Sequence, residues 1–131
     1  MANQRLLSWA LIAFGAIFCL VYPLAMVWPS GWAWHEGSPA TNDYFLMIVG
    51  IYATLGVFLM RAARDPAANA SLIWFTVWSS VVHAGVMAYE AMRTPMQGGH
   101  LFGDVPALLL VALVLGLLMS RTDQAGSRTT A

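Results

Sequence analysis

Residues 69–93, "NASLIWFTVWSSVVHAGVMAYEAMR", form a long apolar segment that nevertheless contains His83 and Glu90. Polar residues recur in this segment at steps of seven, at Asn69, Thr76, His83 and Glu90. Successive residues of an α-helix are rotated by about 100°, so seven steps return almost to the starting direction. The segment therefore predicts a helix with one polar face, flanked by Ser79 and Ser80, and an apolar face opposite to it.

This polar face cannot point into lipid, because hydrocarbon offers no hydrogen-bond partners. We expect it to meet another helix or a wet cavity. Two interpretations of His83 stay open at this point: a structural hydrogen bond to a neighbouring helix, and a functional group that binds a ligand or handles a proton. Glu90 lies about 10 Å farther along the helix axis, so the two side chains do not touch directly.

The composition is typical of a membrane protein. Of the 131 residues, 60% are hydrophobic and 9% are charged, whereas about a quarter of the residues of a soluble domain are charged. Four apolar runs are candidate spanning helices, at residues 6–28, 44–60, 71–92 and 104–120. We predict an all-α fold, an integral membrane antiparallel four-helix bundle, followed by a mobile cytoplasmic tail over residues 121–131. Pro23 should kink the far end of the first span, which we expect to be retained and not cleaved as a signal peptide.

The arginines predict the orientation in the membrane. All six basic residues are arginine. Five of them lie before the first span, between the second and third spans, or after the fourth, and only Arg93 lies on the other side. The positive-inside rule then places both termini in the cytoplasm, an N-in and C-in topology.

Most of the other ionisable residues gather at the predicted outer side: His35, Glu36, Asp43, Glu90, His100 and Asp104. Asp43 and Asp104 suit the first turns of spans two and four, where a carboxylate meets free N–H groups. His35, Glu36 and His100 are expected to be plain loop residues. The candidate binding or proton-handling residues of the whole chain are His83, Glu90, Ser79, Ser80, Thr76, Asp43, His100 and Asp104.

The second span offers a partner for the polar face of residues 69–93. A face of mostly small residues, which would let another helix approach closely, consists of Gly50, Ala53, Thr54 and Val57. We expect this face to pack against His83, with Asp43 and Glu90 approaching each other at the outer mouth.

Several classes of function lack a motif. The chain has no HxxH, HExxH or CxxC spacing and no visible set of nucleophile, base and orienting group, so we expect no metal, no cofactor and no enzymatic activity. A net charge of zero gives no sign of nucleic-acid binding. Four short spans are similar to the small multidrug-resistance exporters, but those proteins carry a carboxylate in the first span and residues 6–28 contain none.

Four stretches carry a family resemblance: "YPLAMVWPSGWAW", "MIVGIYATLGVFLMRAARDP", "SLIWFTVWSSVVHAGVMA" and "GHLFGDVPALLLVALVL". They resemble an uncharacterised family of short bacterial four-helix membrane proteins, a domain-of-unknown-function family, and more loosely the BphX-like proteins. The resemblance covers roughly residues 20–120 and implies a bacterial inner-membrane location. It brings no activity, cofactor or catalytic residue, although it includes His83, His100 and Asp104.

Taken together, these patterns predict a small non-enzymatic multi-pass protein of the bacterial cytoplasmic membrane. Its expected role is accessory, or the binding of a ligand or partner, with the lipid bilayer, a partner membrane protein or a second copy as partners. The alternative is a small proton- or ion-coupled transporter that uses His83 and Glu90.

Overall fold

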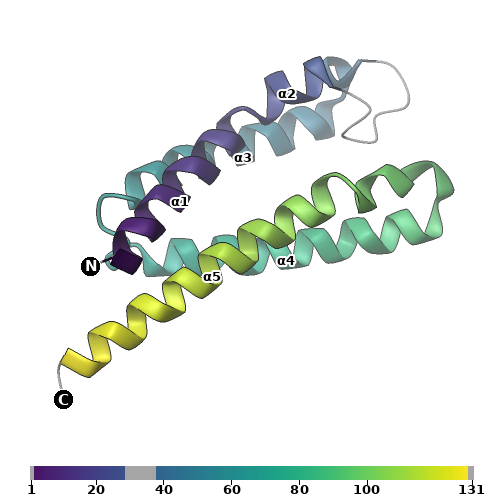
Figure 1. The fold of residues 1–131 in the computed structure, drawn as a ribbon. Helices are drawn as coiled ribbons and strands as arrows, with labels where there is room; N and C mark the ends of the chain where they lie inside the picture. The colour runs from purple at the N-terminus through teal and green to yellow at the C-terminus, as the bar shows by residue number, and fades with distance from the viewer. Residues whose placement is uncertain (1, 29–37, 130–131) are drawn as a thin grey trace.

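The computed structural model describes residues 2–28 and 38–129, with side chains except at residues 2, 95–97 and 123–129. The described residues are helical and contain no strand, which confirms the all-α prediction. Figure 1 shows the elements in chain order: α1 (Ala2–Cys19), α2 (Val21–Val27), the short 3₁₀ helix η2 (Pro39–Thr41), α3 (Asp43–Ala62), α4 (Ala70–Arg93), η3 (Pro95–Leu101) and α5 (Asp104–Thr129).

The first predicted span is a broken helix. The axes of α1 and α2 meet at Leu20 with a bend of 54°. In a continuous helix the ring of Pro23 would clash with the carbonyl group of Cys19, four residues earlier. The helix therefore restarts at Val21, and Pro23 lies in the first turn of α2, where a backbone N–H would have no partner. The expected kink occurs, but just before the proline.

Local hydrogen bonds define where α3 and α4 begin. The Asn42 side chain accepts a hydrogen bond from the Phe45 N–H at 2.9 Å and so caps α3. In the loop before α4, the Asp65 carboxylate accepts a hydrogen bond from the Ala68 N–H at 3.1 Å, and the Asn69 amide donates to the Asp65 carbonyl at 2.8 Å. Both helices begin and end within two residues of the predicted spans. By contrast, α5 continues to Thr129 and takes in most of the predicted tail.

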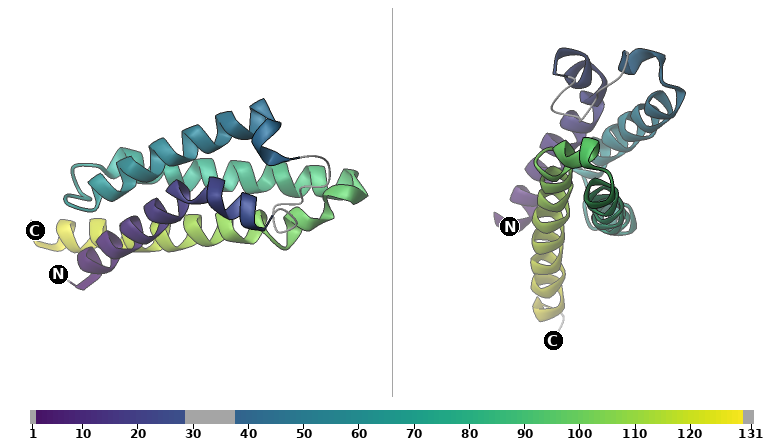
Figure 2. Two further views of the ribbon diagram at one scale, coloured as in Figure 1. Left: turned by 90° about the horizontal axis from the view of Figure 1, so that it is seen from above. Right: turned by 90° about the vertical axis from the view of Figure 1, so that its right-hand side faces the viewer.

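The long helices are arranged as two pairs. α1 packs along α3 and α4 packs along α5, while α1 also contacts α5 and α3 makes few contacts with α4. Figures 1 and 2 show that each long helix reverses the direction of the chain, so both termini lie at the same end. The two pairs approach each other at that end and diverge toward the end that holds η3 (Figure 1).

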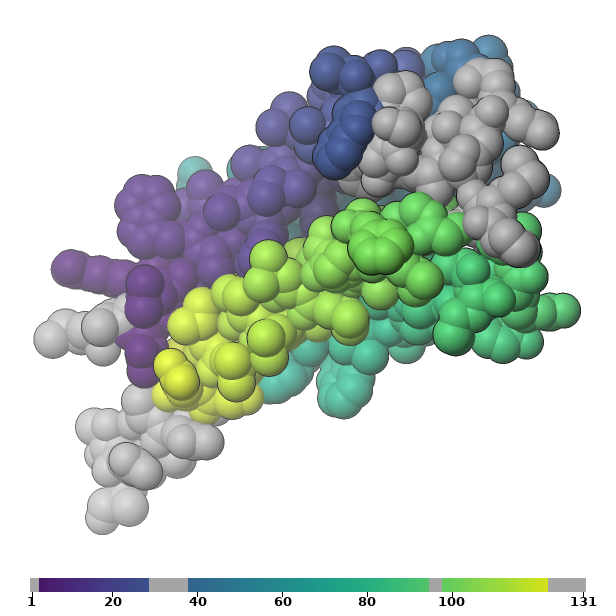
Figure 3. Space-filling view, turned by 45° about the vertical axis from the view of Figure 1, so that its right-hand side comes forward, coloured from purple at the N-terminus to yellow at the C-terminus, as the bar shows by residue number. Residues whose placement is uncertain are grey.

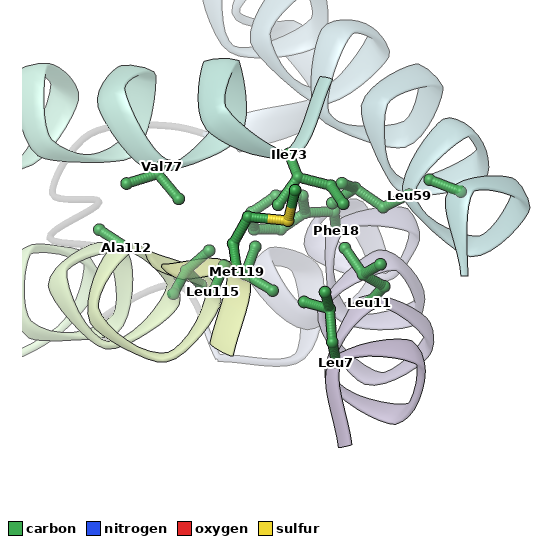
Figure 4. Packing of buried hydrophobic residues seen from close by; sticks show 11 residues of the cluster. Leu7, Leu11, Phe18, Leu59, Ile73, Val77, Ala112, Leu115 and Met119 are labelled. Carbon is green, nitrogen blue, oxygen red and sulfur yellow. The ribbon is translucent and has the colours of Figure 1, made fainter. Parts of the chain in front are cut away.

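The main core lies toward the end that holds the termini, where all four long helices contribute. Its buried members are Leu7, Leu11, Phe18, Leu59, Ala62, Ile73, Val77, Val111, Ala112, Leu115 and Met119. Figure 4 shows the α1 leucines, Ile73 of α4 and Met119 of α5 pointing into one cluster. On the face seen in Figure 3, the side chains of α5 lie directly against those of α1.

Two glycines let α1 and α3 approach closely. A Cβ atom added at Gly15 would lie 2.7 Å from the carbonyl oxygen of Gly56, and one added at Gly56 would lie 2.8 Å from the Cys19 sulfur. The predicted small face of α3 is elsewhere and makes no such approach, since a Cβ at Gly50 would meet nothing within 4 Å. The pairing of that face with α4 was therefore a wrong prediction: α3 uses Gly56 to pack on α1.

Most of the apolar surface of the helices points outward. Three helical segments are long and apolar enough to cross a membrane, namely Asp43–Ala62, Ala70–Arg93 and Gly98–Thr122, and the bent pair α1–α2 makes a fourth if it counts as one span. Only 17% to 28% of the most apolar window of each of the three is buried inside the protein. Such extensive apolar exposure is consistent with a membrane protein, whose outer surface faces lipid.

Candidate functional site

The polar face of α4 turns toward the rest of the protein. Thr76 is fully buried and Ser80 is 4% exposed, whereas Trp78, on the opposite side of the helix, is 64% exposed. The Thr76 hydroxyl donates to the Leu72 carbonyl at 2.9 Å, and the Ser79 hydroxyl donates to the Thr76 carbonyl at 3.2 Å. These two hydroxyls therefore satisfy their donors on their own helix, as polar groups in an apolar setting require.

His83 makes the one side-chain hydrogen bond that joins α3 to α4 among the described residues. The Tyr52 hydroxyl and the His83 Nδ1 atom lie 2.7 Å apart, although the residues are 31 positions apart in the sequence. The two rings are tilted by 44°, with their centroids 5.9 Å apart. The Tyr52 ring also stands edge-on to Phe18 of α1, with centroids at 5.0 Å. Tyr52 thus links three helices at the level of His83.

The direction of this hydrogen bond follows from the chemistry of the two groups. A phenol is a better donor than a neutral imidazole N–H, and an imidazole nitrogen is a good acceptor. We therefore assign the Tyr52 O–H as the donor and His83 Nδ1 as the acceptor. In this tautomer the other ring nitrogen, Nε2, carries the hydrogen and is a donor. Nε2 has no hydrogen-bond partner among the described residues.

A lateral groove of about 270 Å³ lies between α3 and α4 beside this hydrogen bond. Its polar lining consists of Tyr52, Ser79, Ser80 and His83. Its apolar lining consists of Ile48, Ile51, Leu55 and Phe75. The groove exists because α3 packs mainly on α1 and α4 packs mainly on α5. The side chains of α3 and α4 therefore interlock only slightly. We call this feature the α3–α4 groove.

A second polar pair lies at the start of α5. The Nδ1 atom of His100, in η3, is 2.9 Å from both carboxylate oxygens of Asp104. A carboxylate accepts hydrogen bonds, so Nδ1 is the donor here. The His100 and Asp104 side chains are only 14% and 15% exposed. Asp104 occupies the first turn of α5, as predicted, and its side chain also binds a histidine that the sequence had placed in an exposed loop.

The two polar pairs lie on elements that share a second, smaller core. Tyr52 of α3 packs against the cluster of Ala84, Val105 and Leu108, which joins α4 to the start of α5. Four elements, α3, α4, η3 and α5, therefore supply the four side chains of the two pairs. Three of them were candidates from the sequence. Tyr52 was missed, and the only sign of it in the sequence is a phenol hydroxyl in the middle of an apolar run.

Two other candidates lie apart from these two polar pairs. Asp43 is exposed in the first turn of α3, where Asn42 rather than Asp43 provides the cap. Glu90 lies near the end of α4, and its side chain makes no hydrogen bond or ion pair with any described residue. His35 and Glu36 lie outside the described residues. Within residues 2–28 and 38–129, no three His, Cys, Asp or Glu side chains are grouped so that they could hold a metal ion.

Comparison with known proteins identifies the family. The model of a family of unknown function, DUF6632, matches residues 1–130, so the chain belongs to that family. This result confirms the predicted membership of an uncharacterised family. No curated protein and no solved structure matches the chain significantly.

Proposed function

We propose that this DUF6632 member is a small, non-enzymatic, multi-pass protein of the bacterial cytoplasmic membrane that binds an apolar small molecule in the α3–α4 groove. The bent pair α1–α2 forms the first of four antiparallel spans, and both termini face the cytoplasm. The excess of arginine at the end that holds the termini supports this orientation. The outward apolar surface of the helices supports the location.

One observation carries the ligand-binding proposal: the Tyr52–His83 hydrogen bond in the lining of the groove. Tyr52 occupies Nδ1, so the imidazole is held in one orientation and keeps Nε2–H as a donor for a ligand. A fixed donor in an apolar groove is typical of small-molecule sites, in which few polar groups orient a mostly apolar ligand. The ligand would therefore combine a hydrocarbon body with one carbonyl or hydroxyl oxygen.

The hydrogen bonds of Thr76 and Ser79 support binding without catalysis by these two hydroxyls. Ser79 and Thr76 donate to backbone carbonyl groups of α4 and not to a base. A serine nucleophile would need its hydroxyl to donate to a general base instead. The groove also opens sideways, so a ligand would enter from the lipid.

A second candidate function is proton- or ion-coupled transport through His83. Two hydrogen-bonded pairs of ionisable side chains, Tyr52–His83 and His100–Asp104, favour it, because ionisable groups from several helices are typical of proton relays. Glu90, the other residue of this proposal, lies farther along α4. Transport predicts pH-dependent flux in proteoliposomes that His83→Ala abolishes.

Native mass spectrometry of the full-length protein, released from lipid in mild detergent, tests ligand binding. We expect a bound apolar molecule that is retained by wild type and depleted in His83→Phe, which keeps a ring of similar size but has no donor. Tyr52→Phe should weaken retention about fivefold, the effect of one hydrogen bond.

The matched control is Tyr89→Phe, the same change on an exposed tyrosine of α4 that lies outside the groove. A protein that carries no small molecule in any variant, or a ligand lost equally from the Tyr89 variant, would contradict binding at the groove. Flux that depends on His83 would favour the transporter.

A further inference from the structure

A second pocket lies at the opposite end of the molecule from η3, close to the start of α1. It has a volume of about 270 Å³ and is lined by Gln4, Arg5, Ser8, Trp9, Arg64 and Pro66. The first four come from α1 and the last two from the loop after α3, so the pocket forms only because α1 and α3 lie side by side. The lining contains two guanidinium groups, an amide and a hydroxyl.

Neither arginine of this pocket forms an ion pair with a side chain that the structure describes. Among the side chains that the structure describes, the only ion pair is His100–Asp104, so neither Arg5 nor Arg64 is neutralised by a carboxylate there. The nearest acidic residue in sequence, Asp65, instead accepts a hydrogen bond from the Ala68 N–H. Two guanidinium groups that line one pocket without an ion pair to any described carboxylate favour an anion, and a phosphate matches their paired N–H donors.

The surroundings of the pocket indicate where this anion comes from. Trp9 is 69% exposed at the edge of the pocket. Leu6 and Ile17, 55% and 48% exposed, continue the apolar outer surface of α1 on either side of it. A tryptophan between basic and apolar surfaces is typical of the membrane–water boundary. A lipid whose phosphate entered the pocket could lay its acyl chains along this surface of α1.

The size of the pocket agrees with a headgroup. Its volume is about 270 Å³, the same as that of the α3–α4 groove, so the chemistry of the lining and not the size distinguishes the two sites. A phosphodiester with part of its glycerol would fit this open pocket, and the chains would stay outside. Gln4 and Arg5 also lie in the first turn of α1, where the positive end of the helix dipole favours an anion.

We propose that the Arg5–Arg64 pocket binds the phosphate of an anionic phospholipid at the cytoplasmic face of the membrane. The inference uses the membrane location proposed above, but it concerns a site separate from the α3–α4 groove. It assigns a binding role to two arginines that otherwise serve only the positive-inside rule.

Lipid titration of the full-length protein in neutral detergent, followed by native mass spectrometry, tests this proposal. Detergent removes the surface potential of a bilayer, so general attraction of anionic lipid to basic residues is minimised. We expect phosphatidylglycerol to bind and phosphatidylcholine to bind much more weakly. Arg5→Gln and Arg64→Gln should each weaken phosphatidylglycerol binding about tenfold, the effect of losing charged hydrogen bonds. Arg5→Lys should recover part of the affinity, since it keeps the charge but loses the paired donors.

The matched control is Arg61→Gln, which removes one positive charge at the same end of α3 from a residue that lies against Phe58 and outside the pocket. The affinity of this variant for phosphatidylglycerol should stay within about twofold of the wild-type affinity, a smaller change than the loss of one charged hydrogen bond produces. An equal loss of phosphatidylglycerol affinity in the Arg61 variant would show that the lipid is attracted by positive charge in general, and it would overturn the proposal.

Two further measurements distinguish a lipid from a soluble anion and this pocket from the α3–α4 groove. Displacement of phosphatidylglycerol by an equal concentration of inorganic phosphate would identify a soluble anion as the ligand and would overturn the lipid assignment. Tyr52→Phe, which weakens ligand retention in the α3–α4 groove, should leave phosphatidylglycerol binding intact. The lipid proposal and the groove proposal can therefore be refuted separately.

Discussion

Replacing Gly56 by alanine should destabilise the protein, because the new methyl group has no room where α3 crosses α1. A Cβ atom at Gly56 would approach the carbonyl oxygen of Gly15 and would lie 2.8 Å from the Cys19 sulfur and 3.1 Å from the Cys19 backbone nitrogen. Two of these three neighbours are backbone atoms, which cannot rotate away as a side chain could. The helices must therefore separate to accommodate the methyl group.

The size of the effect can be worked out from two opposing contributions. Overpacking a close contact costs about 1–3 kcal/mol. Alanine also stabilises a helix by up to about 1 kcal/mol relative to glycine. For Gly56→Ala we expect the first contribution to dominate and the free energy of unfolding to fall by about 1–2 kcal/mol. For Gly50→Ala in the same helix, where the added Cβ meets nothing within 4 Å, only the second contribution applies.

The chain offers a direct assay for this comparison. Cys19, the single cysteine of the protein, is half-buried at the crossing. A thiol-reactive fluorophore will label it faster as α1 and α3 separate, so labelling during thermal or detergent unfolding reports the relevant transition. The unfolding midpoint should decrease for Gly56→Ala and should stay equal or increase for Gly50→Ala.

The outcome that refutes this reasoning is equally specific. If Gly56→Ala is as stable as wild type while Gly50→Ala is destabilised, α3 uses its other face and packs on α4 through Gly50. If both substitutions are neutral, α1 and α3 do not approach as closely as the distances indicate.

Three further changes test other contacts. Tyr52→Phe should lower the free energy of unfolding by about 1 kcal/mol, because it removes the hydrogen bond between α3 and α4. Chemical unfolding measures this change, and Tyr89→Phe should change the free energy of unfolding by less, since that hydroxyl is exposed. Asn42→Ala should lower the free energy of unfolding by about 1 kcal/mol in the same experiment, because α3 loses its cap. Asn42→Asp should not show this loss, since the aspartate side chain can still accept the hydrogen bond. Asp104→Asn should loosen η3 from α5, because a neutral amide binds the histidine N–H more weakly than a carboxylate does. Hydrogen exchange of the backbone amides around His100 should become faster, and unchanged exchange would show that the His100–Asp104 pair does not hold η3 against α5.

The helices of this protein could be predicted from its sequence because their boundaries depend on local chemistry. Long apolar runs define α3 and α4, and each is preceded by polar residues that cap or close a turn, such as Asn42 and Asp65. The break near Pro23 was also visible, since a proline ring restricts the preceding turn wherever the helix lies. The extent of α5 differed most, because a polar sequence after residue 120 can still continue a helix that is already formed.

The partners of the helices could not be predicted in the same way. Gly15, Gly50 and Gly56 all provide small surfaces, and a single sequence does not say which of them meets another helix. Choosing Gly50 placed the wrong face of α3 toward α4, although the residue that meets His83, Tyr52, is only two positions away. Tyr52 was overlooked because its ring counts as apolar in a periodicity argument, while its hydroxyl decides the contact.

His100 and Asp104 illustrate a different reason for a missed contact. Their spacing of four residues would indicate a pair on one face of a helix, but His100 was expected to be a plain loop residue, since short loops are polar and exposed. The structure forms a 3₁₀ helix there, which still brings the two side chains together before α5 begins. The prediction of a plain loop therefore missed a contact that needs only a short turn.

The positions of tight and loose packing explain why the candidate site lies where it does. Close packing of α1 on α3 through Gly15 and Gly56 commits one face of α3, and α5 covers α4, so α3 and α4 interlock only slightly. The Tyr52–His83 hydrogen bond is then the one side-chain hydrogen bond between α3 and α4 among the described residues. A ligand that accepts a hydrogen bond from His83 Nε2–H would make Nδ1 a better acceptor for Tyr52, because linked hydrogen bonds polarise one another. Ligand binding would then tighten the contact between α3 and α4, and the change would reach the main core through Tyr52 and Leu55, which line the groove and pack against that core.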